Sequence, residues 1–220
     1  ANAATSVFNT DKRMDNVPVK TDFDKVFDVK YSSLMRFAGD VSANIILPGV
    51  NANVSYRMVQ PDYTSLGTYY MTNNYHSLGI TLGTTLFNKL TLSGTFSGQE
   101  DNLSNEQMFT TCGYIYGANA TMRLGNHLNI TAGYNGYLQT QRDGTVKVND
   151  STKIHRMMQS FSLTPTVAFD TELLGHSASL SLNYTENKDL NDFATGESDV
   201  KTKALGLSYN IDVKPIETDF

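Results

Sequence analysis

The sequence predicts an all-β protein, an antiparallel transmembrane β-barrel with about ten strands in this chain, either whole or part of a larger barrel. Three observations predict this fold. Apolar residues occupy every second position over several long stretches, and the positions between them are Ser, Thr, Asn, Gln and Gly with scarcely a charge. The connections between these stretches alternate between short and long. Strict alternation indicates strands with one apolar and one polar face.

The clearest stretch is 74–102, which reads as two strands joined by a tight turn at Asn88-Lys89. One face of the pair is apolar and the other is polar. The apolar positions are Leu78, Ile80, Leu82, Leu86, Leu90, Leu92 and Phe96, and the polar positions after the turn are Thr91, Ser93, Thr95, Ser97 and Gln99. Each strand is longer than the usual five to six residues of soluble proteins, as a membrane-spanning strand requires.

Composition supports a surface that faces lipid. Charged residues make up 18% of the 220 residues, below the roughly 25% of a typical soluble domain. No apolar run is long enough for a transmembrane helix. The net charge of −5 argues against a nucleic-acid partner. Residues 1–25 lack the basic start and apolar core of a signal peptide, so we expect either a removed signal or a chain that begins inside a longer protein.

The first quarter of the chain has the weakest pattern. We expect an irregular polar segment or loop over 1–25 and the strands of the barrel over 26–214. A first strand over Val26–Phe37 and a second over Val41–Leu47 are predicted, with Gly39-Asp40 as the turn between them.

The remaining strands follow in regular order. A turn at Pro48-Gly49 introduces 50–58, and the later strands are predicted over 75–87, 90–101, the stretch that ends at Leu124, 128–138, 161–169, 178–184 and 205–213. Pro165 has no backbone N–H to donate, so we expect it at a bulge or a weakly paired position. Residues 215–220 are expected to form a periplasmic tail.

The alternation of connections predicts which end of each strand faces the cell exterior. Short connections are expected at 48–49, 88–89, 125–126 and 171–175, and long ones at 60–74, 102–107, 142–153 and 187–200. Outer-membrane barrels have short periplasmic turns and long exterior loops. The pattern therefore predicts the outer membrane of a Gram-negative bacterium as the location. The exterior loop candidates are Tyr63, Tyr69, Tyr70, Asp189 and Asp192.

Two segments resemble parts of known proteins. The segment YRMVQPDYTSLGTYY over 56–70, followed by Asn73-Asn74, and the later GQEDNL over 98–103 together resemble large outer-membrane β-barrel proteins of the Bacteroidota, a largely uncharacterised family. The resemblance implies an outer-membrane location and a barrel architecture. It also implies that this region is the C-terminal portion of a longer barrel.

No pattern selects a catalytic or metal site. The histidines (His76, His127, His155 and His176) lie near strand ends on different hairpins, and none accompanies a G-x-S-x-G motif. Acidic residues of the last long loop could in principle hold calcium, but their spacing differs from that of an EF-hand, and we interpret the loop as solvated. Cys112 is in phase with Tyr114 and Tyr116, so we interpret it as a small apolar residue. We expect no enzyme activity, cofactor or metal.

Two arginines interrupt the uncharged polar face. Arg57 and Arg123 alternate with apolar neighbours, and a charge facing lipid at the bilayer centre would cost about 2–4 kcal/mol. We therefore expect both to face the lumen, where they either tune the passage of anions or pair with acidic residues of a loop plug, and we favour pairing. Tyr and Phe recur towards strand ends, as expected at the two membrane interfaces.

These observations leave several functions open. A barrel of this kind could act as a channel or as a scaffold subunit of an envelope complex for secretion, uptake or assembly. Its expected partners are outer-membrane lipid and other envelope proteins. The alternative is a soluble β-sandwich that binds glycans, which the sparse surface charge disfavours.

Overall fold

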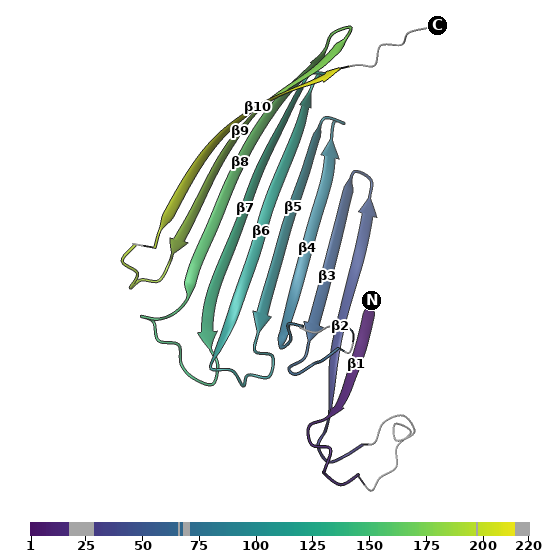
Figure 1. The fold of residues 1–220 in the computed structure, drawn as a ribbon, viewed down its shortest axis with the longest axis vertical. Helices are drawn as coiled ribbons and strands as arrows, with labels where there is room; N and C mark the ends of the chain where they lie inside the picture. Colours follow the sequence, from purple (N-terminus) through teal and green to yellow (C-terminus); the bar gives the residue numbers. More distant parts are fainter. Residues whose placement is uncertain (18–28, 66, 68–70, 197, 214–220) are drawn as a thin grey trace.

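The computed structural model describes residues 1–17, 29–65, 67, 71–196 and 198–213. Within these residues, ten strands form a single antiparallel sheet, and each strand pairs with the next along the chain (Figure 1). The strands are β1 (Asn2–Asn9), β2 (Ser33–Leu47), β3 (Val50–Val59), β4 (Tyr75–Leu86), β5 (Leu90–Asp101), β6 (Phe109–Leu124), β7 (Leu128–Asp143), β8 (His155–Asp170), β9 (Leu174–Asp189) and β10 (Val200–Val213). The prediction of an all-β antiparallel sheet is confirmed.

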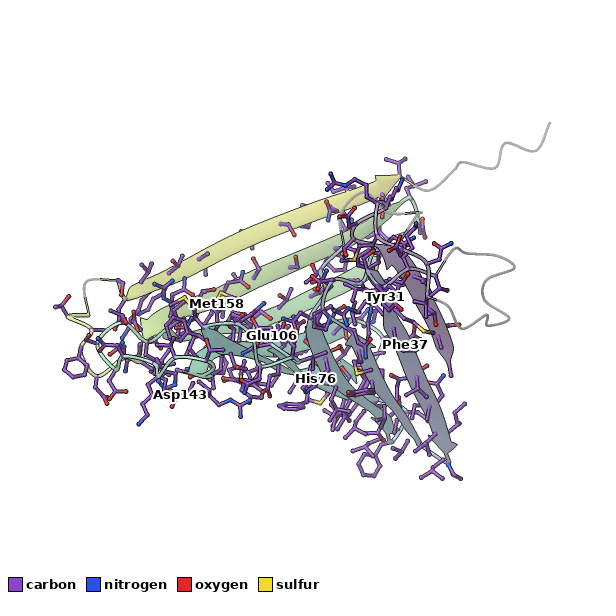
Figure 2. The ribbon with its side chains drawn as sticks, turned by 90° about the horizontal axis from the view of Figure 1, so that it is seen from below. Tyr31, Phe37, His76, Glu106, Asp143 and Met158 are labelled. Carbon is purple, nitrogen blue, oxygen red and sulfur yellow. The ribbon has the colours of Figure 1, made fainter. Side chains whose placement is uncertain are left out.

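The sheet is long, curved and open. In Figure 2 the C-terminal strands (yellow and green) and the N-terminal strands (purple) run in different directions, so the sheet is twisted and curved rather than flat. The strand order runs from β1 to β10, and no pairing between these two outer strands closes the sheet in the described part of the chain. The described residues include no helix long and apolar enough to span a membrane.

The two ends of the sheet differ in their connections. At one end, which we call the turn end, residues 48–49, 87–89, 125–127 and 171–173 join neighbouring strands. At the opposite end, the loop end, β2 begins and β3, β5, β7 and β9 end, and more residues separate these strands from their neighbours along the chain (Figure 1). The predicted alternation of short and long connections is confirmed.

The tight turns follow from local sequence. Gly49 has φ +79°, and Gly125 has φ +68°, a backbone conformation that glycine adopts without cost. The backbone N–H of Lys89 donates to the carbonyl of Leu86 at 3.0 Å, and both residues between them have positive φ. Two consecutive positive φ values define a type I′ turn, which matches the twist of a β-hairpin.

Two predictions for the N-terminal quarter were wrong. Residues 2–9 form β1 rather than an irregular segment, and Gly39-Asp40 lies within the continuous strand β2 rather than in a turn. Gly39 is paired on both sides, with Ala3 of β1 and Met58 of β3. Backbone pairing with β2 holds β1 in place, and the alternation of side chains does not report that pairing. The predicted start of a strand at Val26 lies outside the described residues.

Burial is concentrated at the loop end. Among the described residues, the buried apolar side chains are Val59, Tyr63 and Cys112, and the buried polar ones are Asn74, Asn102 and Thr110. By contrast, apolar side chains along the strands are largely exposed, such as Leu82 at 50% and Leu207 at 80%. No second layer of the described chain covers the apolar face. An exposed apolar surface of this extent is typical of a site that contacts another protein, a membrane or a ligand.

Candidate functional site

The polar face of the sheet consists of rows of short, uncharged side chains. Because each residue pairs with one directly opposite on the next strand, side chains at matching positions form rows across the sheet. One such row brings hydroxyl groups from five consecutive strands together, in the order Thr85, Thr91, Thr121, Thr131 and Thr164. The neighbouring row combines Asn and Ser with Gly, including Ser93, Asn119, Gly133, Ser162 and Asn183.

Glycines on this face make room for the polar side chains beside them. A Cβ at Gly117 would lie 2.8 Å from Oδ1 of Asn135, and one at Gly133 would lie 2.7 Å from Oγ of Ser162. Both distances are shorter than a normal contact, so a larger residue would displace the polar group. The glycines therefore let the amide and hydroxyl groups lie across the sheet surface and keep the middle of the polar face smooth.

Charges lie at the two ends of this face. Arg57 stands near the loop end, directly opposite Asp40 of β2. Further along the same row, Nε of Arg156 lies 3.9 Å from Oδ2 of Asp189. Arg123 lies near the turn end, where it borders a small pocket of about 430 Å³. The register thus places both predicted arginines on the polar face, at opposite ends.

The predicted pairing of these arginines stays a prediction. Among the ion pairs between described residues, neither Arg57 nor Arg123 takes part. The charged row formed by Asp40, Arg156 and Asp189 beside Arg57 was missed, because its members come from strands whose loop-end boundaries the sequence pattern left undefined. The alignment of strand ends, rather than any motif, brings these charges together.

On the opposite face, a band of aromatic rings crosses the middle of the strands from β6 to β9. Tyr116 and Tyr134 have ring centroids 5.9 Å apart, Tyr134 and Phe161 4.6 Å, and Phe161 and Tyr184 6.5 Å. The hydroxyl of Tyr134 donates to Oε1 of Gln159, and that of Tyr184 donates to Oε2 of Glu186. These rings present apolar surfaces to the middle of the sheet and polar tips to the loop end.

A second group of rings lies at the turn end of the same face. The rings of Phe169 and His176 are stacked with centroids 4.8 Å apart, and Nδ1 of His176 lies 2.6 Å from the hydroxyl oxygen of Tyr209. Between the two ring groups the apolar face carries mostly Leu, Ala, Ile, Met and Val. Paired aromatic bands on either side of an apolar band are the arrangement found at the two interfaces of a bilayer.

The loops of the loop end form a packed cluster. Asn102 donates its backbone N–H to the carbonyl of Asn74 at 2.9 Å, and Asn74 donates to the carbonyl of Gln60 at 3.4 Å. The side chain of Asn102 donates to Oγ1 of Thr110 at 2.9 Å and accepts from the backbone N–H of Gln107 at 2.9 Å. Through Asn74 this cluster joins Gln60, in the 56–70 segment, to Asn102, in the 98–103 segment.

The exterior loop candidates have different surroundings. Tyr63 is buried in the loop-end cluster, with 7% of its surface exposed. Asp189 is the last residue of β9 and is partly buried, while Asp192 in the following loop is exposed. Tyr69 and Tyr70 lie outside the described residues. Whether any of them faces the cell exterior stays a prediction.

The other chemically active side chains do not converge. The described residues contain no group of three or more His, Cys, Asp or Glu side chains placed to hold a metal ion. Acidic residues of the last loop instead hold its backbone, because Oδ1 of Asp199 accepts from the N–H of Asp189 at 2.9 Å. Cys112 is buried, and Nε of Arg142 donates to its Sγ at 3.1 Å. Arg142 also forms an ion pair with Glu100.

Comparisons with known proteins give no match: no family model, no curated protein and no solved structure resembles this chain. The functional argument therefore rests on the two faces of the sheet and on the chemistry of their residues. The polar face can line water and form hydrogen bonds with a polar solute. The apolar face can be desolvated only against lipid or another apolar surface.

Proposed function

We propose that this chain forms the wall of an outer-membrane β-barrel of the Bacteroidota type and acts as a channel for small polar solutes. The observation that supports this best is the contrast between the two faces. One carries rows of hydroxyl and amide groups, and the other is apolar and carries two groups of aromatic rings. In a barrel the first face lines the lumen and the second contacts lipid.

The spacing of the aromatic bands fits a bilayer. On β8, Phe161 belongs to the band of rings that crosses β6 to β9, and Phe169 belongs to the turn-end group. Eight residues of antiparallel strand span about 27 Å, which corresponds to a height of about 20 Å at the usual tilt of barrel strands. The apolar band of outer-membrane barrels is about 25 Å tall. A soluble β-sandwich offers no reason for rings to gather at these two depths.

The stagger of the strands also favours a barrel. The row of partners through Asn2, the first residue of β1, runs through Asp40 to Asp189, the last residue of β9. Thus β1 extends from this row towards the loop end, whereas β10 begins at Val200 on the turn-end side, opposite Asn187. Counted along the rows, the mid-points of the two outer strands differ by about 12 residues.

This displacement is what closure of ten strands needs. A barrel of ten strands in which one circuit shifts the register by about 12 residues has a strand tilt of about 40°, inside the usual range of 35–45°. The outer strands would then meet with Val7 opposite Leu205 and Asn2 opposite Asn210. The first pair joins two apolar-face residues and the second joins two polar-face residues, so this register keeps each face continuous. Closure would satisfy the backbone groups of both edges, as lipid demands.

The lumen chemistry indicates the class of solute. Hydroxyl and amide groups can donate and accept hydrogen bonds, and the charges lie at the ends of the face rather than in its middle. Passage is therefore suited to small uncharged polar molecules, with weak selection between ions. Ten strands enclose a narrow lumen, since eight leave little space beyond their side chains.

The test compares matched charge substitutions on adjacent positions of β5. Leu92→Arg places a charge on the apolar face and should cost about 2–4 kcal/mol of folding free energy in lipid, whereas Thr91→Arg places it in the lumen and should cost little. Folding into phosphatidylcholine vesicles is measured by the heat-dependent shift in gel mobility, and conductance is measured in planar bilayers. Equal tolerance of the two substitutions would contradict the assignment of the faces.

A scaffold subunit of an envelope complex is a second candidate, and the packed loop-end cluster favours it. Buried Asn102 and Asn74 give this end a defined surface that a partner could recognise. A scaffold predicts co-purification with other envelope proteins after mild detergent extraction and no conductance. Steady conductance by the purified chain would instead favour the channel function over the scaffold function.

A further inference from the structure

The apolar face contains a groove of about 1190 Å³ that crosses the sheet from β3 to β10. Its floor is made by small residues of the central strands (Gly94, Ala118, Ala120 and Ala132), and larger side chains form its walls on both sides. The groove exceeds the 300–1,000 Å³ of pockets for drug-sized ligands. It is open along its length, so an elongated apolar molecule fits it better than a compact one.

The groove runs obliquely from one membrane interface to the other. At one end it begins at Val50, the first residue of β3, next to the turn end. At the other end it reaches Lys203, the fourth residue of β10, near the loop end. Seven steps between neighbouring strands correspond to about 34 Å across the sheet. Rings of the aromatic band (Tyr134, Phe161 and Tyr184) line the part of the groove that leads to Lys203, and they share one row with it.

The loop-end mouth of the groove carries a positive charge. Lys203 lies opposite Tyr184 of β9, and it takes part in none of the ion pairs between described residues. The next cation along β10, Lys201, is instead held by Glu186, with Nζ 3.2 Å from Oε1. Lys203 thus remains available to a ligand, at the depth where tyrosine hydroxyls mark the edge of the apolar band.

We propose that this groove binds a membrane lipid with an anionic phosphate headgroup, drawn from the leaflet at the loop end. The acyl chain lies along the groove between the aromatic and aliphatic walls, and the phosphate contacts the ammonium group of Lys203. A long apolar channel with one cation at its interfacial mouth matches the charge and shape of such a lipid. The inference rests on the proposed membrane location of the apolar face.

The test uses single tryptophan reporters, for which the chain is suited because it contains no Trp. Phe161→Trp places a reporter in the groove, two strands from Lys203 in the same row. Phe96→Trp places a control on the apolar face outside the groove lining. Each variant is folded into vesicles of phosphatidylcholine and phosphatidylglycerol. The acyl chains of only one of the two lipids carry bromine, which quenches nearby tryptophan.

At Phe161→Trp we expect phosphatidylglycerol to associate about fivefold more strongly than phosphatidylcholine, since one lysine near a membrane surface attracts an anionic lipid to that degree. At Phe96→Trp the two lipids should quench equally. Adding Lys203→Gln should abolish the preference at Phe161→Trp. Lys89→Gln, at the turn end, should preserve it and serves as the matched control.

The outcomes separate the lipid site from the membrane location. Quenching of both reporters without preference for phosphatidylglycerol would overturn the lipid site and leave the membrane location intact. Absence of quenching at both reporters would overturn the membrane location and the lipid site together. A preference that survives Lys203→Gln would overturn the assignment of the headgroup. The heat-dependent gel shift confirms that each variant has folded before its quenching is compared.

Discussion

At the scale of single residues, an asparagine joins two loops through hydrogen bonds that the apolar–polar alternation of the strands does not predict. Asn102 is buried with φ +63°, and it joins the loops after β3 and β5 through hydrogen bonds of its backbone and side chain. Asparagine tolerates the left-handed conformation and also offers an amide for hydrogen bonding. Its position directly after a strand is therefore part of how the loop-end cluster folds.

Replacement of Asn102 should separate these two contributions. Asn102→Ala removes the two short side-chain hydrogen bonds, to Thr110 and from the Gln107 N–H, at about 1 kcal/mol each, and places a Cβ-bearing residue without local hydrogen bonding in the left-handed region, at a further 1–2 kcal/mol. Asn102→Gly removes the same hydrogen bonds, but glycine adopts the left-handed backbone conformation without strain. We expect Asn102→Ala to lower the free energy of unfolding by about 3 kcal/mol and Asn102→Gly by about 1 kcal/mol less. Urea titration in lipid vesicles measures both, and equal losses would argue against backbone strain.

Residue identities alone could predict which side chains share a face, but not which of them are buried. Tyr63 was expected in an exterior loop because it lies in a long connection, and the loop-end cluster buries it to 7% exposure, which the length of the connection does not predict. Cys112 was expected on the apolar face, and the contact with Arg142 could not be foreseen because it joins two neighbouring strands through their register. The burial of a side chain depends on which residues of other strands and loops lie against it, and the spacing of residues in the sequence does not give this information.

At the scale of strands, glycine and aromatic residues act as cross-strand pairs. Gly136 of β7 is buried, and a Cβ at this position would overlap the ring of Tyr116 on the neighbouring strand. The ring therefore lies over the glycine and fills the space that a side chain would otherwise occupy. Such pairs fix the register of two strands, because a shift would leave the ring without its space.

Substitution by alanine should have different effects on the free energy of unfolding at Gly136 and at Gly94. Gly136→Ala forces Tyr116 out of place, and overpacking of this kind costs about 1–3 kcal/mol. Gly94→Ala is the matched control on β5, because its new Cβ would approach nothing closer than 3.8 Å. It should leave the free energy of unfolding unchanged or raise it by up to about 1 kcal/mol. Urea titration in the same vesicles measures both variants, and a similar loss in both would contradict the pairing.

The alternation of apolar and polar residues predicted the strands correctly where two neighbouring strands both alternate. It predicted them poorly at the β1 edge of the sheet. The strands from β3 to β10 follow the expected order, and Pro165 lies where the β8–β9 register lacks the positions from Thr164 to Pro165, as its missing N–H requires. By contrast, β1 has a small and mostly polar sequence, and β2 contains Gly39-Asp40. Both are held by backbone hydrogen bonds with a neighbour, which side-chain periodicity cannot report.

At the scale of the whole sheet, the sequence predicted two faces and two ends but not the stagger. Every strand contributes its own displacement, and only the sum across all of them decides whether the outer strands can meet. The displacement of about 12 residues between β1 and β10 emerges from the register of each pair. The same stagger tilts the groove, so that its ends lie at opposite sides of the apolar band. Closure and lipid binding are thus both consequences of register.

The closure of the sheet can be tested by a disulfide between its outer strands. In a Cys112→Ala background, Val7→Cys and Leu205→Cys place two thiols opposite each other in the proposed register, within reach of a bond. We expect oxidation in lipid vesicles to join them within one molecule, seen as a change in gel mobility that a reductant reverses. Val7→Cys with Ala204→Cys is the control, because these side chains lie on opposite faces and should not join.

The alternative outcomes would identify what the edges contact instead. A disulfide between two molecules would show that the outer strands pair between copies, because an open edge offers its backbone groups to any strand. Absence of a disulfide, with both variants folded, would show that other strands lie between β1 and β10. A larger barrel of that kind would have a wider lumen, since diameter grows with strand number. Conductance should then exceed that of a ten-stranded barrel, and the solutes admitted should be correspondingly larger.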